Sequence, residues 1–228
     1  MSRGVFVTGT DTGVGKTVAA CALIHALRAR GLRAIPMKPF AAGASPGPDG
    51  RMVNDDTLRL LAAAGLDASW AEAVTPVVLR EPMAPHIAAA LEGRVLALDP
   101  VVQALPRLFA AGDFVVVEGV GGFKVPLGDR LDTVDLAREL GFPVVLVVGL
   151  RLGCLNHALL SADAIRASGL RLAGWIGTAI DRDMPVRDEN VAALRARLGA
   201  PLLGVLAHSS APDARELSAC LDPAPLLA

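Results

Sequence analysis

The chain has 228 residues, of which 53% are hydrophobic and 20% charged, and its formal net charge is −1. This balance is ample for a large buried core and excludes an intrinsically disordered chain. Without a basic excess it also argues against nucleic acid or a membrane surface as the partner. No linker or low-complexity run divides the sequence, so we expect one domain over residues 1–228.

Short β-type runs and longer helical patterns alternate along the chain. Strands are predicted at residues 4–8, 34–37, 114–118, 144–148, 172–177 and 202–205, and helices at 16–30, 55–64, 99–111, 134–140, 156–168 and 187–198. Several strands are apolar throughout, as strands covered on both faces must be. The alternation predicts a doubly wound, three-layer α/β sandwich with a mostly parallel sheet. In such a sheet, ligands bind beyond the carboxyl ends of the strands.

The first predicted strand runs into a glycine-containing loop, Gly9-Thr-Asp-Thr-Gly-Val-Gly-Lys-Thr17, and then into a helix. This is the context of a P-loop, in which backbone N–H groups and the helix start hold phosphates. Lys16 can reach the β- and γ-phosphate oxygens, and Thr17 can ligate Mg²⁺. Thr10 occupies the place of the first glycine in the usual spacing, so the loop is a variant. It predicts a protein that binds a nucleoside triphosphate.

Lysine is rare in this chain. Among 22 basic residues only Lys16, Lys38 and Lys124 are lysines. A compact ammonium on a flexible stem can serve where a planar guanidinium cannot. We therefore expect Lys16 and Lys38 to be functional, and we interpret the lysine at position 124 as a chance occurrence without a functional role.

Acidic residues follow two of the predicted elements. The apolar strand at 114–118 ends on Glu118, which resembles the Walker B acid that holds Mg²⁺ beside a P-loop. Asn54-Asp-Asp56 enters the helix predicted at 55–64, where Asp55 is expected to cap the helix and Asp56 to bind the metal. Cys21, Cys154 and Cys220 stand far apart with no CxxC spacing, so we expect reduced thiols.

The apolar runs and the N-terminal sequence indicate where in the cell the protein acts. The longest apolar runs, such as 143–150, are of strand length and far from the roughly 20 residues of a membrane helix. The N-terminus enters a strand at once and lacks a basic region followed by an apolar segment. We expect a cytoplasmic protein with a small-molecule ligand.

Several segments together resemble the dethiobiotin synthetase family of P-loop NTPases. Beyond the loop at 9–17, they are Lys38-Pro39, Glu81-Pro82 with Pro85-His86, Glu118-Gly-Val-Gly-Gly122, Gly153-Cys-Leu-Asn-His157, Leu172-Ala-Gly-Trp175 and Ala200-Pro-Leu-Leu-Gly204. The resemblance spans nearly the whole chain. It implies that 7,8-diaminononanoate takes up CO₂ as a carbamate, that ATP phosphorylates the carbamate, and that the second amine closes the ring to give dethiobiotin, ADP and phosphate.

The resemblance also implies roles for individual residues. Lys16, Thr12 and Lys38 would act on the transferring phosphoryl group and the carbamate, and Thr17, Asp56 and Glu118 would hold Mg²⁺. The implied nucleotide site comprises Thr10, Asp11, Thr12, Gly13, Val14, Gly15, Lys16, Thr17, Glu118, Thr178 and Leu206. The implied substrate site comprises Lys38, Ala42, Pro82, Gly121, Arg151, Gly153, Cys154, Leu155 and Asn156. The helix start at 153–156 would receive the substrate carboxylate across a homodimer interface.

The chain departs from the family pattern at a few positions. Ala42 stands where many members have serine, Arg151 where they commonly have lysine, and Asn190 where some have tyrosine. Thr178 stands where many have an asparagine that reads the purine edge, which leaves fewer groups to recognise adenine. His86 and His157 are interpreted as packed polar residues rather than catalytic bases.

Two alternatives remain beside this interpretation. A partition or site-selection switch ATPase shares the fold, but its loop carries a signature lysine near its start, where this chain has Asp11. An ATP-dependent amidoligase is related by fold, but it usually needs an amidotransferase domain for which 228 residues leave no room.

Overall fold

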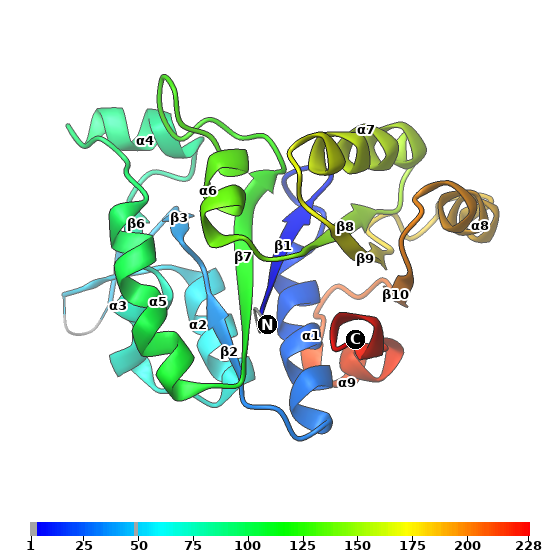
Figure 1. The fold of residues 1–228 in the computed structure, drawn as a ribbon, viewed down its shortest axis with the longest axis horizontal. Coiled ribbons are helices and arrows are strands. Elements are labelled where there is room, and N and C mark those ends of the chain that lie inside the picture. The colour runs from blue at the N-terminus through cyan, green and yellow to red at the C-terminus, as the bar shows by residue number, and fades with distance from the viewer. Residues whose placement is uncertain (1–3, 48–49) are drawn as a thin grey trace.

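The computed structural model describes residues 4–47 and 50–228, and its centre is a parallel sheet in the order β10-β9-β8-β1-β7-β2 (Figure 1). The strands are β1 (Gly4–Gly9), β2 (Ala34–Met37), β7 (Phe114–Gly122), β8 (Val144–Gly149), β9 (Leu172–Thr178) and β10 (Leu202–Leu206). Every pairing within this sheet is parallel. All six strands were predicted, and their parallel arrangement confirms the doubly wound fold. Because β1 lies between β7 and β8, the loop that follows it emerges near the middle of the sheet's carboxyl edge.

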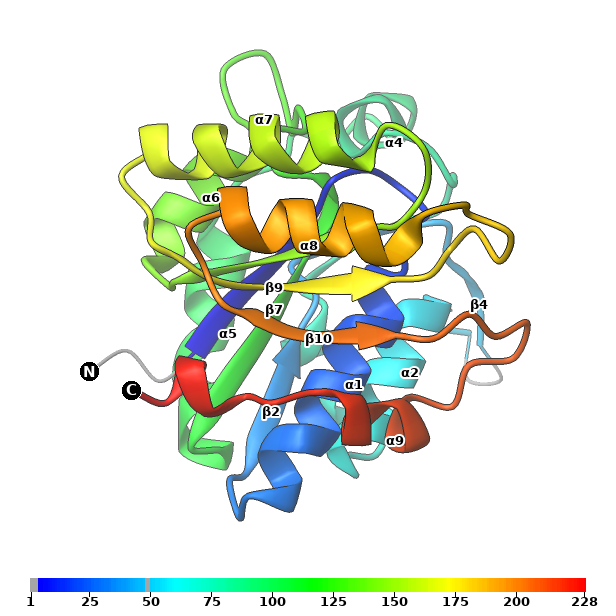
Figure 2. The same cartoon turned by 90° about the vertical axis from the view of Figure 1, so that its right-hand side faces the viewer.

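Helices cover both faces of the sheet (Figure 2). One face carries α1 (Lys16–Ala29), α2 (Asp55–Ala64) and the short α9 (Ala214–Leu217). The other carries α5 (Asp99–Ala111), α6 (Thr133–Leu140), α7 (Cys154–Ala167) and α8 (Arg187–Arg197). The six predicted helices are confirmed to within two residues at either end, and the molecule is the expected three-layer sandwich.

Two apolar cores form because successive side chains of a strand point to opposite faces of the sheet. On β1, Val5 and Val7 pack against α1, whereas Phe6 packs in the core beneath α5 and α6. All three side chains are fully buried, and complete burial of such a side chain contributes about 1.5–3 kcal/mol. The same alternation is why a sheet covered on both faces reads as a continuous apolar run.

Several short elements were not predicted. They are β3 (Phe40–Ala42), β4 (Ser45–Pro46), β5 (Met52–Val53), β6 (Val77–Leu79), α3 (Ala71–Val74), α4 (Pro85–Leu91), α9 (Ala214–Leu217) and three 3₁₀ helices at Ala68–Trp70, Ser218–Cys220 and Ala224–Leu226. Elements of two to seven residues are too short for a hydrophobic period to be read. β3 pairs in parallel with β6 beside the carboxyl end of β2. In the described part of the chain, no helix is long and apolar enough to cross a membrane.

Candidate active site

The loop between β1 and α1 has the backbone geometry of a phosphate cradle. Gly13 and Gly15 have φ angles of 74° and 80°, in the left-handed region that favours glycine. Gly15 is the N-cap of α1 and carries no side-chain cap, so the helix start offers its N–H groups and positive dipole end to an anion. At Gly9, an added Cβ would lie only 2.7 Å from the Cγ2 atom of Val14. The variant spacing of the motif thus keeps a glycine where the loop folds back over the strand end.

The side chain of Lys16, the first residue of α1, contacts the backbone of the phosphate loop. Its Nζ atom donates a 2.9 Å hydrogen bond to the carbonyl oxygen of Asp11, and the residue is only 8% exposed. Burial lowers the pKa of Lys16 to about 8, because the charged ammonium loses hydration there. The ammonium therefore lies inside the cradle, where the negative charge of bound phosphates would offset its lost hydration.

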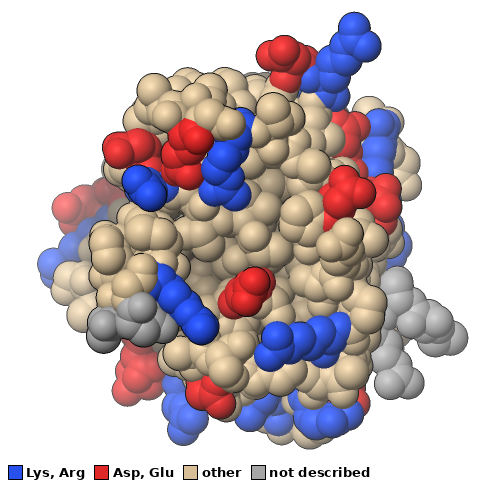
Figure 3. Space-filling model, turned by 90° about the vertical axis from the view of Figure 1, so that its left-hand side faces the viewer, with Lys and Arg blue, Asp and Glu red and all other residues tan. Residues whose placement is uncertain are grey.

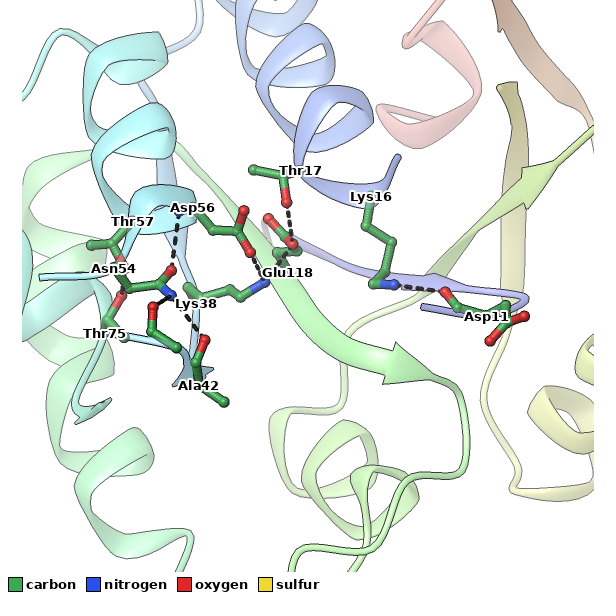
Figure 4. Close-up of polar contacts among 11 residues, drawn as sticks. Asp11, Lys16, Thr17, Lys38, Ala42, Asn54, Asp56, Thr57, Thr75 and Glu118 are labelled. Carbon is green, nitrogen blue, oxygen red and sulfur yellow. Dashed lines mark hydrogen bonds and ion pairs between the residues drawn. The ribbon is translucent and has the colours of Figure 1, made fainter. Parts of the chain in front are cut away.

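Lys38 follows β2 and extends into a cluster of acidic side chains (Figure 4). Its Nζ atom lies 2.5 Å from Oε1 of Glu118 and 2.9 Å from Oδ2 of Asp56. Lys38 and Glu118 are 4% and 1% exposed. Burial alone would lower the pKa of Lys38, but the two carboxylates raise it above its ordinary value. The ammonium of Lys38 is thus held charged between two acids that the sequence had identified separately.

Oxygen atoms converge on the same point from three elements. Thr17 Oγ1 donates a 2.9 Å hydrogen bond to Oε1 of Glu118, the oxygen that also contacts Lys38. The other oxygen of Glu118, Oε2, is buried and has no hydrogen-bond partner in the described residues. Hydroxyl and carboxylate oxygens, with one carboxylate oxygen still unpaired, fit Mg²⁺, which is usually held by one or two carboxylates plus phosphate oxygens. No cluster of three or more His, Cys, Asp or Glu residues able to hold a metal occurs within residues 4–47 and 50–228.

The start of α2 differs from the expectation in one respect. Asn54 caps the helix: its side-chain oxygen accepts a 3.0 Å hydrogen bond from the N–H of Asp56. Asp55, the expected cap, is exposed in the first turn, because the capping position is one residue earlier. The amide of Asn54 also donates to the carbonyl oxygens of Ala42 and Gly43, at 3.1 and 3.3 Å. Asn54 therefore fixes both Asp56 and the segment after β3, a role that sequence reasoning missed although Asn is a preferred N-cap.

Other residues of the expected substrate site lie around these groups. An added Cβ on Gly121 would come within 3.6 Å of the Thr12 hydroxyl, which places the end of β7 against the phosphate loop. The ring of Pro82 lies over Gly43, whose added Cβ would be 3.1 Å from the proline Cβ. Ala42, half-buried on β3, shares this neighbourhood through Asn54. The predicted residues at the ends of β1, β2, β3 and β7 are therefore brought together.

The loop after β8 leads into α7 and contacts the phosphate loop through an ion pair. Arg151 Nη2 lies 2.7 Å from Oδ2 of Asp11, and the Oδ1 atom of Asp11 accepts a 2.7 Å hydrogen bond from the N–H of Thr12. Two residues further on, Gly153 with φ 93° forms the N-cap of α7 without a side-chain cap. Cys154 is buried, Leu155 half-buried and Asn156 exposed in the first turn. This helix start can hold an anion in the same way as the start of α1.

Thr178 lies under the phosphate loop. Its hydroxyl donates to the carbonyl oxygen of Val14 at 2.6 Å and lies 3.2 Å from that of Val148. The hydroxyl is therefore engaged by backbone rather than directed outward. Leu206, at the end of β10, is buried, and its carbonyl oxygen accepts a 2.9 Å hydrogen bond from the N–H of Ala179. Both residues lie at the carboxyl edge of the sheet, as expected.

The two histidines of interest lie apart from the acidic cluster. His86 is half-buried at the start of α4, and its Nδ1 atom is buried with no hydrogen-bond partner in the described residues. His157 is half-buried in the first turns of α7. Neither makes a hydrogen bond that links it to Lys38, Asp56 or Glu118.

Comparison with known proteins extends beyond the loop motif. Residues 3–214 match a family described as an AAA domain. The chain is 53% identical to the ATP-dependent dethiobiotin synthetase BioD of Aromatoleum aromaticum over 221 residues, covering 96% of each chain. It is 52% identical to the protein of the same name from Ralstonia nicotianae over 223 residues, covering 98% of this chain and 96% of the other.

Solved structures show the same fold at much lower identity. The septum site-determining protein MinD of Pyrococcus horikoshii, complexed with Mg-ADP, superposes with a TM-score of 0.54 at 17% identity, covering 92% of this chain and 82% of the other. A chain of the MinC:MinD cell division protein complex of Aquifex aeolicus also gives a TM-score of 0.54, at 14% identity, covering 92% of this chain and 83% of the other. At these identities the likeness concerns the fold alone, whereas the relatives near 50% identity are close over nearly their full length.

Proposed function

The chain belongs to the dethiobiotin synthetase family, and we propose that it uses ATP and Mg²⁺ to convert 7,8-diaminononanoate and CO₂ into dethiobiotin in biotin synthesis. The observation that carries this proposal is the convergence of Lys16, Lys38, Asp56 and Glu118 beside the phosphate loop. A nucleotide site needs one lysine on the phosphates. A second buried lysine suits a reaction in which another anion must approach the γ-phosphate.

The reaction joins one carbon to two amines. One amine adds to CO₂ and loses a proton to give a carbamate. A carbamate oxygen attacks the γ-phosphorus, ADP leaves, and a carbamic-phosphoric mixed anhydride forms. The second amine then attacks the carbamoyl carbon, phosphate leaves with its bonding electrons, and the ring closes as the amine loses a proton. Both bond-forming steps bring charged or nucleophilic groups together, so positioning and charge stabilisation dominate the catalysis.

We assign the residues by what they contact. Lys16 and the N–H groups of the loop would hold the β- and γ-phosphates, with Thr12 beside the transferring group. Thr17, Asp56 and Glu118 would hold Mg²⁺, which neutralises charge as it develops on the phosphate oxygens. Lys38 would bind the carbamate and the transferring phosphoryl group. This role is supported by the position of its ammonium next to Asp56 and Glu118, the proposed metal ligands.

The remaining site residues would bind the ends of the two substrates. Thr178 and Leu206 would border the base of the nucleotide, and Ala42, Pro82 and Gly121 would line the diamine site. The N–H groups at Gly153, Cys154, Leu155 and Asn156 would receive the substrate carboxylate, with Arg151 nearby. These assignments follow from the family resemblance and are supported by the uncapped start of α7.

We further propose that the enzyme is a homodimer with the substrate site at its interface. Leu152, directly before the α7 start, is 95% exposed, and Leu160 on the same helix is 61% exposed. A second copy packed there would cover both leucines and enclose the carboxylate end of the substrate. Sedimentation of the purified protein tests this, and a monomer at micromolar concentration would contradict it.

The partners in this proposal are small molecules, and the protein is one domain over residues 1–228 that acts in the cytoplasm. On the face shown in Figure 3, lysines and arginines are interspersed with acidic residues and much of the surface is uncharged. The three free cysteines, Cys21, Cys154 and Cys220, suit a reducing compartment.

ADP release by the purified protein with Mg²⁺ and ATP tests the function. We expect release to require both the diamine and bicarbonate, and mass spectrometry to find dethiobiotin. ADP release that is independent of the diamine would favour the switch ATPase, the alternative of the same fold. Its support is limited to structural likeness at 14–17% identity.

A further inference from the structure

The ammonium of Lys38 occupies the place at which the metal ligands converge. Asp56 Oδ2 and Glu118 Oε1 are its two contacts, at 2.9 and 2.5 Å. Thr17 Oγ1 lies 2.9 Å from that same Glu118 oxygen. In Figure 4 the Lys38 side chain points between Asp56 and Glu118, toward the side from which Thr17 projects. A cation bound by these three oxygens would therefore take the contacts that the lysine makes now.

Charge balance in the cleft explains this arrangement. The cluster holds two ammonium groups, Lys16 and Lys38, and two carboxylates, Asp56 and Glu118, so their formal charges cancel. Glu118 is buried and Asp56 is partly exposed, and the buried carboxylate needs a cation beside it, since an unpaired buried charge is strongly destabilising. Lys38 meets that need through hydrogen bonds to both acids. The charge of Lys38 is thereby paired with these carboxylates and is not available to a carbamate or a phosphoryl group.

We propose that the ammonium of Lys38 pairs with the metal-binding carboxylates of Asp56 and Glu118, and that a divalent cation which binds these carboxylates displaces the ammonium toward the co-substrate. This inference rests on the proposed magnesium-dependent function. It adds that binding of the metal releases the Lys38 ammonium from the two carboxylates, so that the ammonium can contact the substrate. Lys38 then reaches the anionic substrate only when the metal is in place.

The displacement follows from the chemistry of the two cations. A divalent ion attracts the carboxylates more strongly than an ammonium does, and it repels a positive charge at the same contacts. Mg²⁺ also takes oxygen ligands at about 2.0–2.1 Å, closer than the ammonium contacts seen here. The backbone of Lys38 is fixed by a 2.8 Å hydrogen bond from its N–H to the carbonyl oxygen of Val74. The flexible side chain is thus the part that moves.

Binding of Mn²⁺ to the nucleotide-free protein, followed by electron paramagnetic resonance of the free ion, provides the first test. If Lys38 competes for the ligands, Lys38→Gln and Lys38→Met should bind Mn²⁺ more tightly than the unaltered protein, by about tenfold or more. Lys124→Gln removes an exposed lysine instead and should bind as the unaltered protein does. Asp56→Asn combined with Lys38→Gln should abolish the gain. Equal or weaker binding by both Lys38 variants would overturn the proposal.

The movement of the lysine can be observed directly without altering the site. Labelling with ε-¹³C lysine gives signals from only three lysines, Lys16, Lys38 and Lys124, which single substitutions assign. Mg²⁺ without nucleotide should shift the Lys38 signal along the same titration curve as metal binding, and it should leave Lys124 unmoved. An unmoved Lys38 signal at saturating Mg²⁺ would overturn the proposal. Neither experiment depends on turnover, so a protein that fails to make dethiobiotin could still pass both.

Discussion

The guanidinium of Arg151 lies 2.7 Å from the carboxylate of Asp11, joining the loop after β8 to the phosphate loop across 140 residues of sequence. The two side chains are 43% and 47% exposed, and an exposed ion pair contributes only about 0–1 kcal/mol to stability. The contact thus sets the position of the loop and of the segment leading into α7 more than it stabilises the fold.

Arg151→Ala is accordingly expected to affect ligand binding more than stability. We predict that it raises the KM for ATP and for the diamine together, because the contact borders both proposed sites. The melting temperature should fall by no more than about 2–4 °C. Steady-state kinetics and thermal unfolding of the same preparation check this. Unchanged KM values for both substrates would show that the pair has no positioning role.

Lys38→Arg is expected to reduce kcat by about 100-fold or more, although the charge is retained. Lys38 is only 4% exposed, and its ammonium already lies 2.5 Å from Glu118. The wider guanidinium cannot take this place without moving Asp56 or Glu118. Lys124→Arg, at an exposed position, is the matched control and should turn over normally. A near-normal kcat for Lys38→Arg would contradict the need for a point charge.

The pKa of Lys16, about 8 in the nucleotide-free protein, predicts how ATP binding depends on pH. Only the protonated lysine attracts phosphate, so affinity should be constant well below pH 8 and decline as the pH rises through that value, by up to about tenfold per unit. Binding above pH 8 should take up a proton. Calorimetry in buffers of different ionisation heat measures both effects.

Lys16→Arg is the control for this pH dependence, because a guanidinium stays charged throughout the range. The larger guanidinium is expected to weaken ATP binding by the variant at every pH, because Lys16 is only 8% exposed, but the affinity of the variant should show no decline near pH 8. A constant ATP affinity of the unaltered protein up to about pH 9.5 would contradict the lowered pKa.

Thr178→Val tests whether the hydroxyl holds the loop or reads the base. Because that hydroxyl donates to the carbonyl oxygen of Val14 at 2.6 Å in a buried position, its loss should lower the free energy of unfolding by about 1–3 kcal/mol. The preference among ATP, CTP and GTP should not change. Competition assays on both proteins check this, and an altered preference in the variant would show that Thr178 contacts the base.

The sequence by itself determined the central sheet, the main helices and the phosphate loop. These features follow from local rules: apolar runs and helical periods span enough residues to be read, and the loop motif is contiguous from Gly9 to Thr17. The scarcity of lysine among the basic residues also singled out Lys16 and Lys38, although the sequence did not show which residues they contact. The family followed from short segments in order, which near-full-length relatives at about 50% identity bear out.

Only the tertiary structure decided which of these residues meet. Glu118 lies 80 residues beyond Lys38, and Thr178 lies 164 residues beyond Val14, so no local pattern could pair them. Such contacts depend on strand order, which places the ends of β1, β2 and β7 side by side. The cap at Asn54 shows the same limit at short range, because a choice among three adjacent polar residues depends on backbone angles. The sequence thus supplied the cations and acids, and the sheet placed Lys38 on the metal ligands.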